Sequence, residues 1–373
     1  MRDALPAWVE LGLLPLLNLA FAFLVTGVIV VILGENPLEA VELLVYGAFG
    51  YGEAWGYTLF YATNFIFTGL AVALAFHAGL FNIGGEGQAY IGGLGAGLAA
   101  LAFGGGSPFL VLPLCVLGAA LFGAVWGFIP GWLQAKRGSH VVITTIMLNF
   151  VAASLMTYLM VNVLIVRGSQ IPESAGFGPG ADMPGLNGLL NLFGLDVGRS
   201  PLNLSLVLAL VCCVLVWAFV WKSRPGYEVR VVGQSEPAAR YAGIVPGNKV
   251  ILAMTLSGVL AGLMAVNEVL GAQHRLVLGF SGGYGFVGIA VALMGRSHPF
   301  GVVLAALLFG ALYQGGSELA FDMPAISRDM VVVIQGLVIL FAGALEHMFR
   351  PFLTGIFVRR RDAAPAVREA ARG

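Results

Sequence analysis

The chain has little charge for its length. Its 373 residues include 19 basic and 19 acidic ones, so 10% are charged, against about 25% in an ordinary soluble domain. Hydrophobic residues make up 59% of the chain. A soluble fold of this size needs a charged surface that this composition cannot provide. The sequence therefore predicts a protein that crosses a membrane several times.

Several kinds of functional site are also absent from the sequence. Cys115, Cys212 and Cys213 stand in apolar runs without a CxxC or Cys/His spacing, which excludes a disulfide framework and predicts no metal site. Net charge is zero and no stretch is dense in Lys or Arg before the C-terminus, so no nucleic-acid partner is expected. The chain has no GxxxxGK[ST] phosphate loop and no Ser/His/Asp or paired-carboxylate arrangement. We expect a protein that is not an enzyme.

Apolar runs long enough to cross a bilayer recur along the chain. A bilayer core needs about 20 apolar residues per helix, and the longest run is interrupted by the turn signal Gly104–Pro108. The runs are continuous and lack the alternation of β-strands, so helices are expected. The predicted fold is an all-α, polytopic membrane domain over residues 1–373 with about ten transmembrane helices, near 11–34, 55–77, 88–103, 109–133, 141–166, 202–221, 250–272, 278–295, 299–316 and 330–347.

The basic residues predict the orientation, because cytoplasmic segments of membrane proteins are enriched in Lys and Arg. With both termini in the cytoplasm, the inner segments hold 15 basic residues and the outer segments hold the other four. The acidic stretch 34–54 is then an outer loop. The predicted parts are a first half over about 11–166, a periplasmic segment 167–201, a second half over about 202–347 with a cytoplasmic loop 222–249, and a basic tail 348–373 that meets lipid head groups. We expect the chain in the inner (plasma) membrane.

A short glycine motif occurs twice. Gly84–Gly87 reads GGEG and Gly282–Gly285 reads GGYG, each closely preceded by a phenylalanine. The two motifs open the third and eighth predicted spans, which run in opposite directions across the membrane. This relationship predicts an inverted repeat of two five-helix halves, which is typical of transporters with broken helices along the pathway.

The 53 glycines have two interpretations. Most are expected to let helices pack closely through small faces. Where polar residues accompany them, unwound backbone could instead line a wet path. The predicted pathway residues are Asn82, Gly84, Gly85, Glu86, Gln88, Asn149, Gly282, Gly283, Tyr284 and Gly285.

Three polar residues leave alternatives open. Glu86 is either an inner-surface residue or part of a re-entrant segment beside the pathway. Asn149 either bonds to another helix or lines the pathway, because an unpaired amide in lipid is costly. Glu268 follows Lys249 by 19 positions, about 28 Å of helix, so we expect it near the outer surface, paired with Arg275 or contacting a docked protein.

The inner loop 222–249 contains a predicted short helix over 236–242. Ser235 or Glu236 caps it, Pro237 suits its first turn, and Gly243 suits the position after its end. A helix of this length is not stable alone in water. It therefore packs on the membrane domain or enters a groove of another protein; the alternative is that it belongs to an ordinary structured loop.

Four strings carry a resemblance to a known family. They are Gly79–Gln88 (GLFNIGGEGQ), Ile143–Asn149 (ITTIMLN), Gly226–Ile244 (GYEVRVVGQSEPAARYAGI) and Gly285–Gly301 (GFVGIAVALMGRSHPFG). They resemble permease subunits of ABC importers in the branched-chain amino acid, ribose and nucleoside permease superfamily, and within it the simple-sugar or nucleoside group. The strings lie in both halves of the chain in matching order.

The resemblance implies a set of partners and a role. The chain would pair with a second, similar permease subunit, with a cytoplasmic ATP-binding protein that has two nucleotide sites, and with an extracytoplasmic substrate-binding lipoprotein. ATP and Mg would be bound by the partner ATPase, and this chain would bind no cofactor. The inner loop would dock on the ATPase, which assigns coupling to Tyr227, Arg230, Glu236, Ala239, Arg240, Tyr241 and Gly243.

The expected function is import of a nucleoside or related small polar solute. A simple sugar is the alternative cargo, and a riboflavin-like compound also stays open. A self-sufficient secondary transporter would need a buried ionic site, and the charges of this chain lie mostly at the ends of the predicted spans. A membrane-embedded transferase would need clustered titratable residues, which the sequence does not show.

Overall fold

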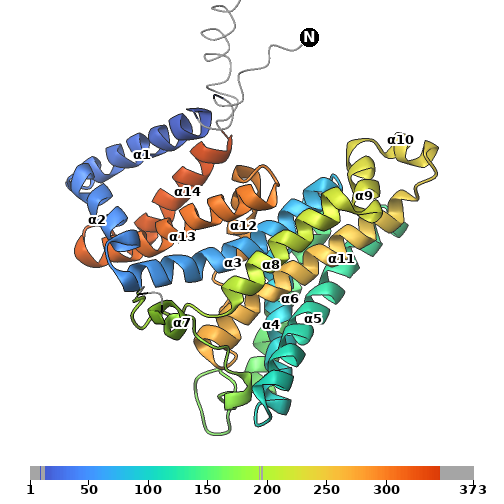
Figure 1. The fold of residues 1–373 in the computed structure, drawn as a ribbon, viewed down its shortest axis with the longest axis horizontal. Coiled ribbons are helices and arrows are strands. Elements are labelled where there is room, and N and C mark those ends of the chain that lie inside the picture. Colours follow the sequence, from blue (N-terminus) through green and yellow to red (C-terminus); the bar gives the residue numbers. More distant parts are fainter. Residues whose placement is uncertain (1–8, 10–12, 193, 195, 345–373) are drawn as a thin grey trace, which may run out of the picture. The chain divides into compact units, whose positions relative to one another are not determined.

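The computed structural model describes residue 9 and residues 13–192, 194 and 196–344 (Figure 1). The regular secondary structure of these residues is helical, and two isolated β-bridges occur in the loops. The elements are α1 (Leu14–Ile32), α2 (Pro37–Phe49), α3 (Gly52–His77), α4 (Gly85–Phe103), α5 (Pro108–Arg137), α6 (Val141–Asn162), the 3₁₀ turn η2 (Pro179–Ala181), α7 (Asn187–Leu192), α8 (Ser205–Trp217), the π-helical η3 (Ala218–Lys222), α9 (Arg224–Gln234), α10 (Glu236–Tyr241), α11 (Pro246–Ala265), the π-helical η4 (Val266–Gln273), α12 (Tyr284–Met294), α13 (Pro299–Asp322) and α14 (Arg328–Ala344).

Within the described part of the chain, six helices are long and apolar enough to cross a membrane. They are α3, α5, α6, α8 continued by η3, α11 continued by η4, and α13. The pair α1–α2, bent by 118°, brings the number to seven if it forms one span. The prediction of an all-α, polytopic membrane protein is therefore confirmed. Of the other predicted spans, 88–103 lies within α4, 278–295 is helical only over the 11 residues of α12, and the described part of 330–347 lies within the 17-residue α14.

Most of the segment 34–54, which was predicted as an outer loop, is helix α2, and its side of the membrane stays a prediction. The Asn36 side chain accepts the Leu38 N–H at 3.0 Å and so caps the helix, and Pro37 suits its first turn. Ala40 and Leu44 are buried one turn apart, whereas Glu39 and Glu42 are exposed. The acidic residues that suggested a loop thus occupy one face of an amphipathic helix.

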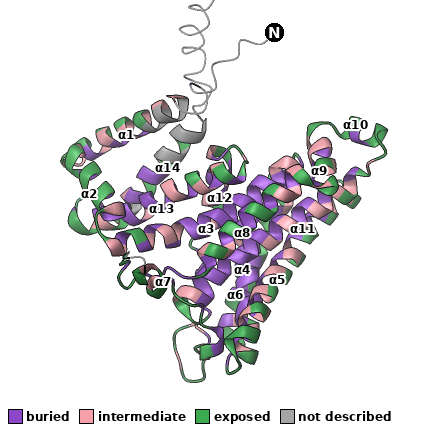
Figure 2. Ribbon diagram, viewed as in Figure 1, coloured by how far each residue is buried: buried purple, intermediate pink, exposed green. Residues whose placement is uncertain are grey.

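The chain forms two compact units, Ala48–Gln314 and a unit made of Met1–Gly47 with Gly315–Gly373. In the larger unit α3 and α11 are central, since 83% and 72% of their most apolar windows are buried, against 22% in both α5 and α6. Figure 2 shows the same contrast between purple central helices and mixed colours on α5 and α8. In the smaller unit, α1 packs against α14 around buried Val30, Leu319 and Ile334.

Close packing of the central helices depends on glycine. α11 packs against both α4 and α5. A Cβ added at Gly92 of α4 would lie 2.8 Å from the carbonyl oxygen of Gly262, and a Cβ added at Gly123 of α5 would lie 3.0 Å from the Cα of Gly262. The prediction that many glycines form small packing faces is confirmed at these crossings.

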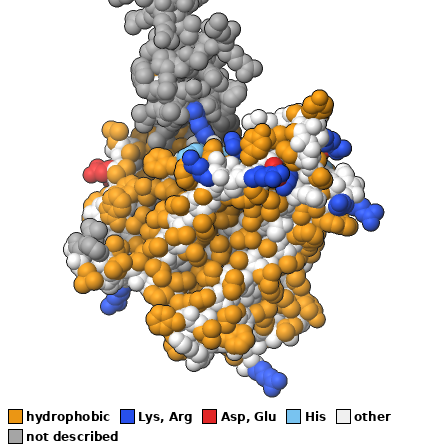
Figure 3. All heavy atoms as spheres, turned by 45° about the vertical axis from the view of Figure 1, so that its right-hand side comes forward, with side chains coloured by type: hydrophobic (Ala, Val, Ile, Leu, Met, Phe, Trp, Pro, Cys, Tyr) orange, Lys and Arg blue, Asp and Glu red, His pale blue; other side chains and the backbone are white. Residues whose placement is uncertain are grey.

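The surface brought forward in Figure 3 is mostly hydrophobic, with Lys and Arg side chains near its upper and lower edges. Many large apolar side chains of α5, α6 and α8 are exposed, among them Leu117, Phe150 and Val214. Such a continuous apolar surface is expected where helices face lipid acyl chains.

Candidate functional site

The two glycine motifs meet in the structure. The Glu86 carboxylate, in the first turn of α4, accepts hydrogen bonds from the Ser281 hydroxyl (2.6 Å) and from the backbone N–H groups of Gly283 (3.1 Å) and Gly285 (2.8 Å). Glu86 therefore lies at the N-terminus of α12, where unpaired N–H groups and the helix dipole stabilise negative charge. It caps a helix that follows it by nearly 200 residues.

Glycine is required on the α12 side of this junction. Gly282 and Gly283 have φ angles of +53° and +79°, which residues with a Cβ rarely adopt. A Cβ on Gly285 would overlap the backbone of Gly85 and Glu86. The beginnings of α4 and α12 thus touch backbone to backbone, as only glycine allows.

Amide side chains hold the start of α4 from its other sides. The Asn82 Nδ2 donates to Gln88 Oε1 (3.0 Å) and Ser257 Oγ (2.8 Å), and its Oδ1 accepts the Gly84 N–H (2.8 Å). Asn149 of α6 accepts the Gly87 N–H (2.9 Å) and donates to the Ile83 carbonyl (3.0 Å).

The predicted residues of the first motif therefore form one hydrogen-bonded group. Asn149 bonds to another helical segment, as one of its two interpretations predicts. Buried amides that satisfy each other in this way fix a unique backbone. Lining of a pathway by these residues stays a prediction.

Tyr284 connects the second motif to an aromatic group. Its ring packs on Phe65 (5.5 Å between ring centroids, nearly perpendicular), on Tyr313 (5.9 Å) and on Tyr61 (6.3 Å). The three tyrosines are each only partly buried. They place amphipathic rings, with a polar end, immediately beside the Glu86 junction.

A second carboxylate, Glu268, is buried within the larger unit. Glu268 is 4% exposed and accepts a 2.6 Å hydrogen bond from Asn64 Nδ2 on α3. The predicted pairing with Arg275 was wrong, because Arg275 bonds to Glu173 (2.9 Å).

Two structural features explain the error. The helix runs on beyond α11 as η4, which contains Glu268. The segment 167–201 covers the end of η4, with the Met183 N–H donating to the Leu270 carbonyl (3.2 Å) and the Phe177 N–H to the His274 carbonyl (2.8 Å). The position of Glu268 estimated from helix rise alone does not include burial by this covering segment.

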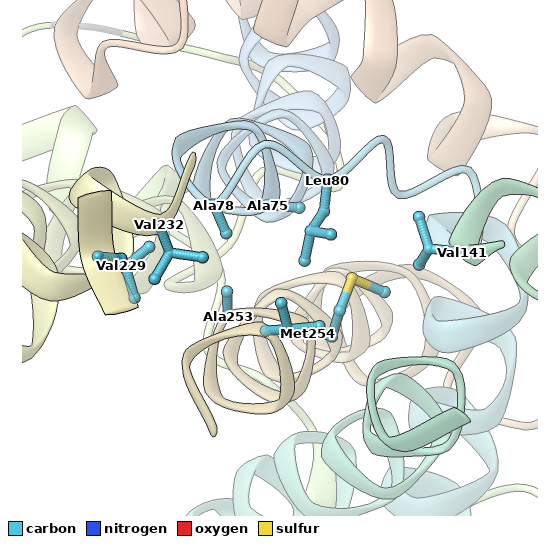
Figure 4. Close-up of a cluster of buried hydrophobic side chains, with 10 residues drawn as sticks. Ala75, Ala78, Leu80, Val141, Val229, Val232, Ala253 and Met254 are labelled. Atoms are coloured by element: carbon cyan, nitrogen blue, oxygen red, sulfur yellow. The ribbon is translucent and has the colours of Figure 1, made fainter. Parts of the chain in front are cut away.

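The inner loop forms two short helices on the larger unit. Ser235 accepts the Ala238 N–H (3.4 Å) at the start of α10, and Gly243 follows the helix with φ +76°. The predicted short helix and both of its ends are confirmed. The helix α9 before it was not predicted; Figure 4 shows its Val232 directed toward Ala78 and Ala253, within one buried apolar cluster.

The predicted coupling residues divide into buried and exposed ones. Ala239 is fully buried in the same apolar cluster as Val232. Arg230 is partly buried, and its Nε has no hydrogen-bond partner among the described residues. Tyr241 is 98% exposed and Tyr227 is 57% exposed, and the Arg240–Glu236 pair (2.6 Å) is exposed as well. The exposed side chains form the part of the loop that another protein could contact.

An ion-pair group fixes α9 against the start of α11. Glu228 accepts from Lys249 Nζ (2.5 Å) and from Arg224 Nε (3.0 Å). The hydrogen bond from Lys249 is the largest cause that lowers the pKa of Glu228 below its ordinary value, and Arg224 adds to it. The carboxylate is therefore charged throughout the physiological range.

The larger unit is a polytopic helical domain in which helix ends and polar side chains lie together in the interior. This architecture is typical of membrane transporters. The chain matches the family described as the branched-chain amino acid transport system / permease component over residues 54–343. It belongs to this family and is the permease subunit of an ABC importer, a transport subunit rather than an enzyme.

Relatives match almost the whole chain. It is 38% identical to a glucose ABC transporter permease of Haloferax volcanii, over 98% of this chain and 95% of the relative. It is 35% identical to a guanosine ABC transporter permease of Bacillus subtilis (89% and 93%) and 34% identical to a nucleoside ABC transporter permease of Lactococcus lactis (88% and 90%). No solved structure matches the chain.

Proposed function

We propose that the chain passes a nucleoside or a related small polar solute from an extracytoplasmic binding protein to the cytoplasm. The observation that carries this proposal is the junction at Glu86, where two helix starts, a carboxylate and the partly exposed Tyr284 ring lie together. Hydroxyl groups of a cargo can donate to the carboxylate, and a base or sugar ring can pack on tyrosine.

The pathway follows from the same contacts. The proposed lining residues are those of the two glycine motifs with Asn82, Gln88 and Asn149. In this proposal α4 and α12 are broken-helix elements of two inverted halves with ten spans in all, and both termini are cytoplasmic. The meeting of the two helix N-termini supports it, since inverted repeats bring equivalent half-helices together at a central site.

The partners proposed are those of an ABC importer. A second, similar permease subunit completes the membrane part, and an extracytoplasmic lipoprotein delivers the cargo. A cytoplasmic ATP-binding protein with two nucleotide sites carries ATP and Mg, while this chain binds no cofactor. Exposed Tyr241, Tyr227 and the Arg240–Glu236 pair form the proposed contact with the ATPase, and Ala239 anchors that contact to the membrane domain.

A simple sugar is the second candidate cargo. The glucose permease that matches over 98% of this chain favours it, whereas two relatives whose names give guanosine and nucleosides favour a nucleoside. A ribose and a hexose present similar hydroxyl groups, so the contacts at Glu86 suit both. A nucleobase adds a flat aromatic surface that suits the tyrosine group.

A ligand screen on the cognate binding protein separates these candidates. We expect guanosine or another nucleoside to raise its melting temperature and to be taken up, with ATP, into liposomes that contain the complete complex. Stabilisation and uptake of glucose without any response to nucleosides would establish the sugar alternative. Uptake that continues without the ATPase would contradict the importer assignment.

A further inference from the structure

A chain of buried amides ends at the Glu268 carboxylate. The Asn203 Nδ2 donates to Asn267 Oδ1 (2.9 Å), the Asn267 Nδ2 donates to Asn64 Oδ1 (2.8 Å), and the Asn64 Nδ2 donates to Glu268 Oε1 (2.6 Å). All four side chains are at least 95% buried. Each bond polarises the next, and all of them point hydrogen atoms toward the carboxylate.

The carboxylate keeps one oxygen available. Among the residues that the structure describes, the bond from Asn64 is the only hydrogen bond of the Glu268 side chain. A buried charge with so few partners is costly inside a membrane and marks a functional position by default. Glu268 also stands in the π-helical segment η4, a rare conformation that occurs frequently at functional sites.

The position of Glu268 links it to the junction at Glu86. Asn64 is one turn beyond Tyr61 on α3 and next to Phe65, and both of these rings pack on Tyr284. Tyr284 in turn stands between Gly283 and Gly285, whose N–H groups donate to the Glu86 carboxylate. Tyrosine rings and two acids therefore occupy one continuous region of the larger unit.

We propose that Glu268, positioned by Asn64, is a second binding residue for the cargo and accepts a hydrogen bond from one of its hydroxyl groups through the free oxygen. This inference rests on the proposed function and narrows its substrate class. The ligand that fits is neutral, rich in hydroxyl groups and unphosphorylated, because two nearby carboxylates repel a phosphate. The tyrosine rings supply the apolar surface for a sugar or base.

The test uses the complete complex in liposomes, with guanosine and glucose as the two cargo probes. Glu268→Gln keeps the shape of the side chain and removes its charge. We expect its uptake per ATP hydrolysed to fall about tenfold for the cargo that the wild type transports, with unchanged cargo affinity of the binding protein. Glu173→Gln removes an acid of the segment 167–201 and leaves that ratio unchanged. An unchanged ratio in Glu268→Gln overturns the inference.

A second measurement on the unmodified protein avoids any effect of mutation on folding. A hydrophobic carbodiimide is applied while the complex is trapped with vanadate, and modification of Glu268 is followed by peptide mass spectrometry. We expect modification to be several-fold slower with cargo-loaded binding protein than with empty binding protein. Equal rates overturn the inference. Lack of wild-type uptake of either probe contradicts the proposed function itself, so the two failures are distinguishable.

Discussion

The Glu86 carboxylate accepts a 2.6 Å hydrogen bond from the Ser281 hydroxyl, across 195 residues of sequence. This contact joins the first turn of α4 to the segment that opens α12. Both segments are rich in glycine, and their backbones touch. A carboxylate that caps a distant helix start fixes the relative position of two helices and leaves charge beside a tyrosine ring.

Replacement of Glu86 tests the capping role. Glu86→Ala leaves the hydroxyl of Ser281 and the N–H groups of Gly283 and Gly285 without their acceptor. We expect a loss of stability of about 1–3 kcal/mol and a larger loss of uptake than in Glu86→Gln, which retains an acceptor oxygen. Thermal unfolding and liposome uptake measure the two effects. Glu39→Gln, on the exposed face of α2, serves as control, and equal behaviour of Glu86→Ala and this control contradicts the role.

Two glycine-to-alanine variants test the close packing of α4 against α11. A Cβ at Gly92 meets the backbone of Gly262, whereas a Cβ at Gly105 meets nothing within 4 Å. Overpacking of a close helix crossing costs about 1–3 kcal/mol. We therefore expect Gly92→Ala to lower the melting temperature of the detergent-solubilised complex and Gly105→Ala to leave it unchanged. The same melting temperature in both variants speaks against close packing at this crossing.

Docking of the ATPase is tested on the exposed side of α10. Arg240→Glu combined with Tyr241→Ala reverses one charge and removes an almost fully exposed ring. The exposed Arg240–Glu236 pair contributes little to folding, so we expect normal membrane levels with a strong loss of ATPase association and uptake. Copurification of the ATPase measures association. Wild-type association in the double variant disproves docking on this surface, and Arg199→Glu in the segment 167–201 is the control.

The Glu228–Lys249 contact predicts a pH effect on the inner loop. The lowered pKa of Glu228, caused first by the hydrogen bond from Lys249, means that the folded state holds this proton less tightly than the unfolded state. The resulting stabilisation is complete above the ordinary pKa of a glutamate, about 4.3, and is lost as the pH falls through the lowered value.

Hydrogen exchange of α9 between neutral and acidic pH measures that stabilisation. We expect the protection factor of α9, which corrects the rate for the intrinsic pH dependence of exchange, to fall at the acidic end. We expect Lys249→Met to have a lower protection factor at neutral pH and a weaker dependence on pH. A pH response of Lys249→Met that equals that of the wild type contradicts the assignment.

Local features of the fold were predictable, and distant contacts were not. Ser235 and Gly243 mark the ends of α10 because capping is decided by residues next to one another in sequence. The contact of Asn64 with Glu268 spans 204 residues, and hydropathy contains no information about it. The polar residues Asn64, Asn267 and Glu268 inside apolar runs were the available signal, since buried polar groups in a membrane need partners.

The sequence predicted only part of the arrangement of the repeated glycine motif. The sequence placed Gly84–Gly87 and Gly282–Gly285 in one pathway but did not show that Glu86 bonds directly to the second motif. Helix α2 was missed for a related reason. Its charged and apolar residues alternate with helical spacing. A search for long windows without charged residues passes over such a helix and assigns the segment to a loop.

Labelling of Tyr284→Cys tests the central claim, that the junction of the two glycine motifs lies on the transport pathway. In the complete complex in liposomes, with Cys115, Cys212 and Cys213 replaced, a water-soluble maleimide should label Tyr284→Cys. Cargo-loaded binding protein with ATP should slow that labelling several-fold, while labelling of the control Gly105→Cys, in the open turn between α4 and α5, should stay constant. Failure of Tyr284→Cys to react from either side, or labelling that cargo leaves unchanged, would contradict the account.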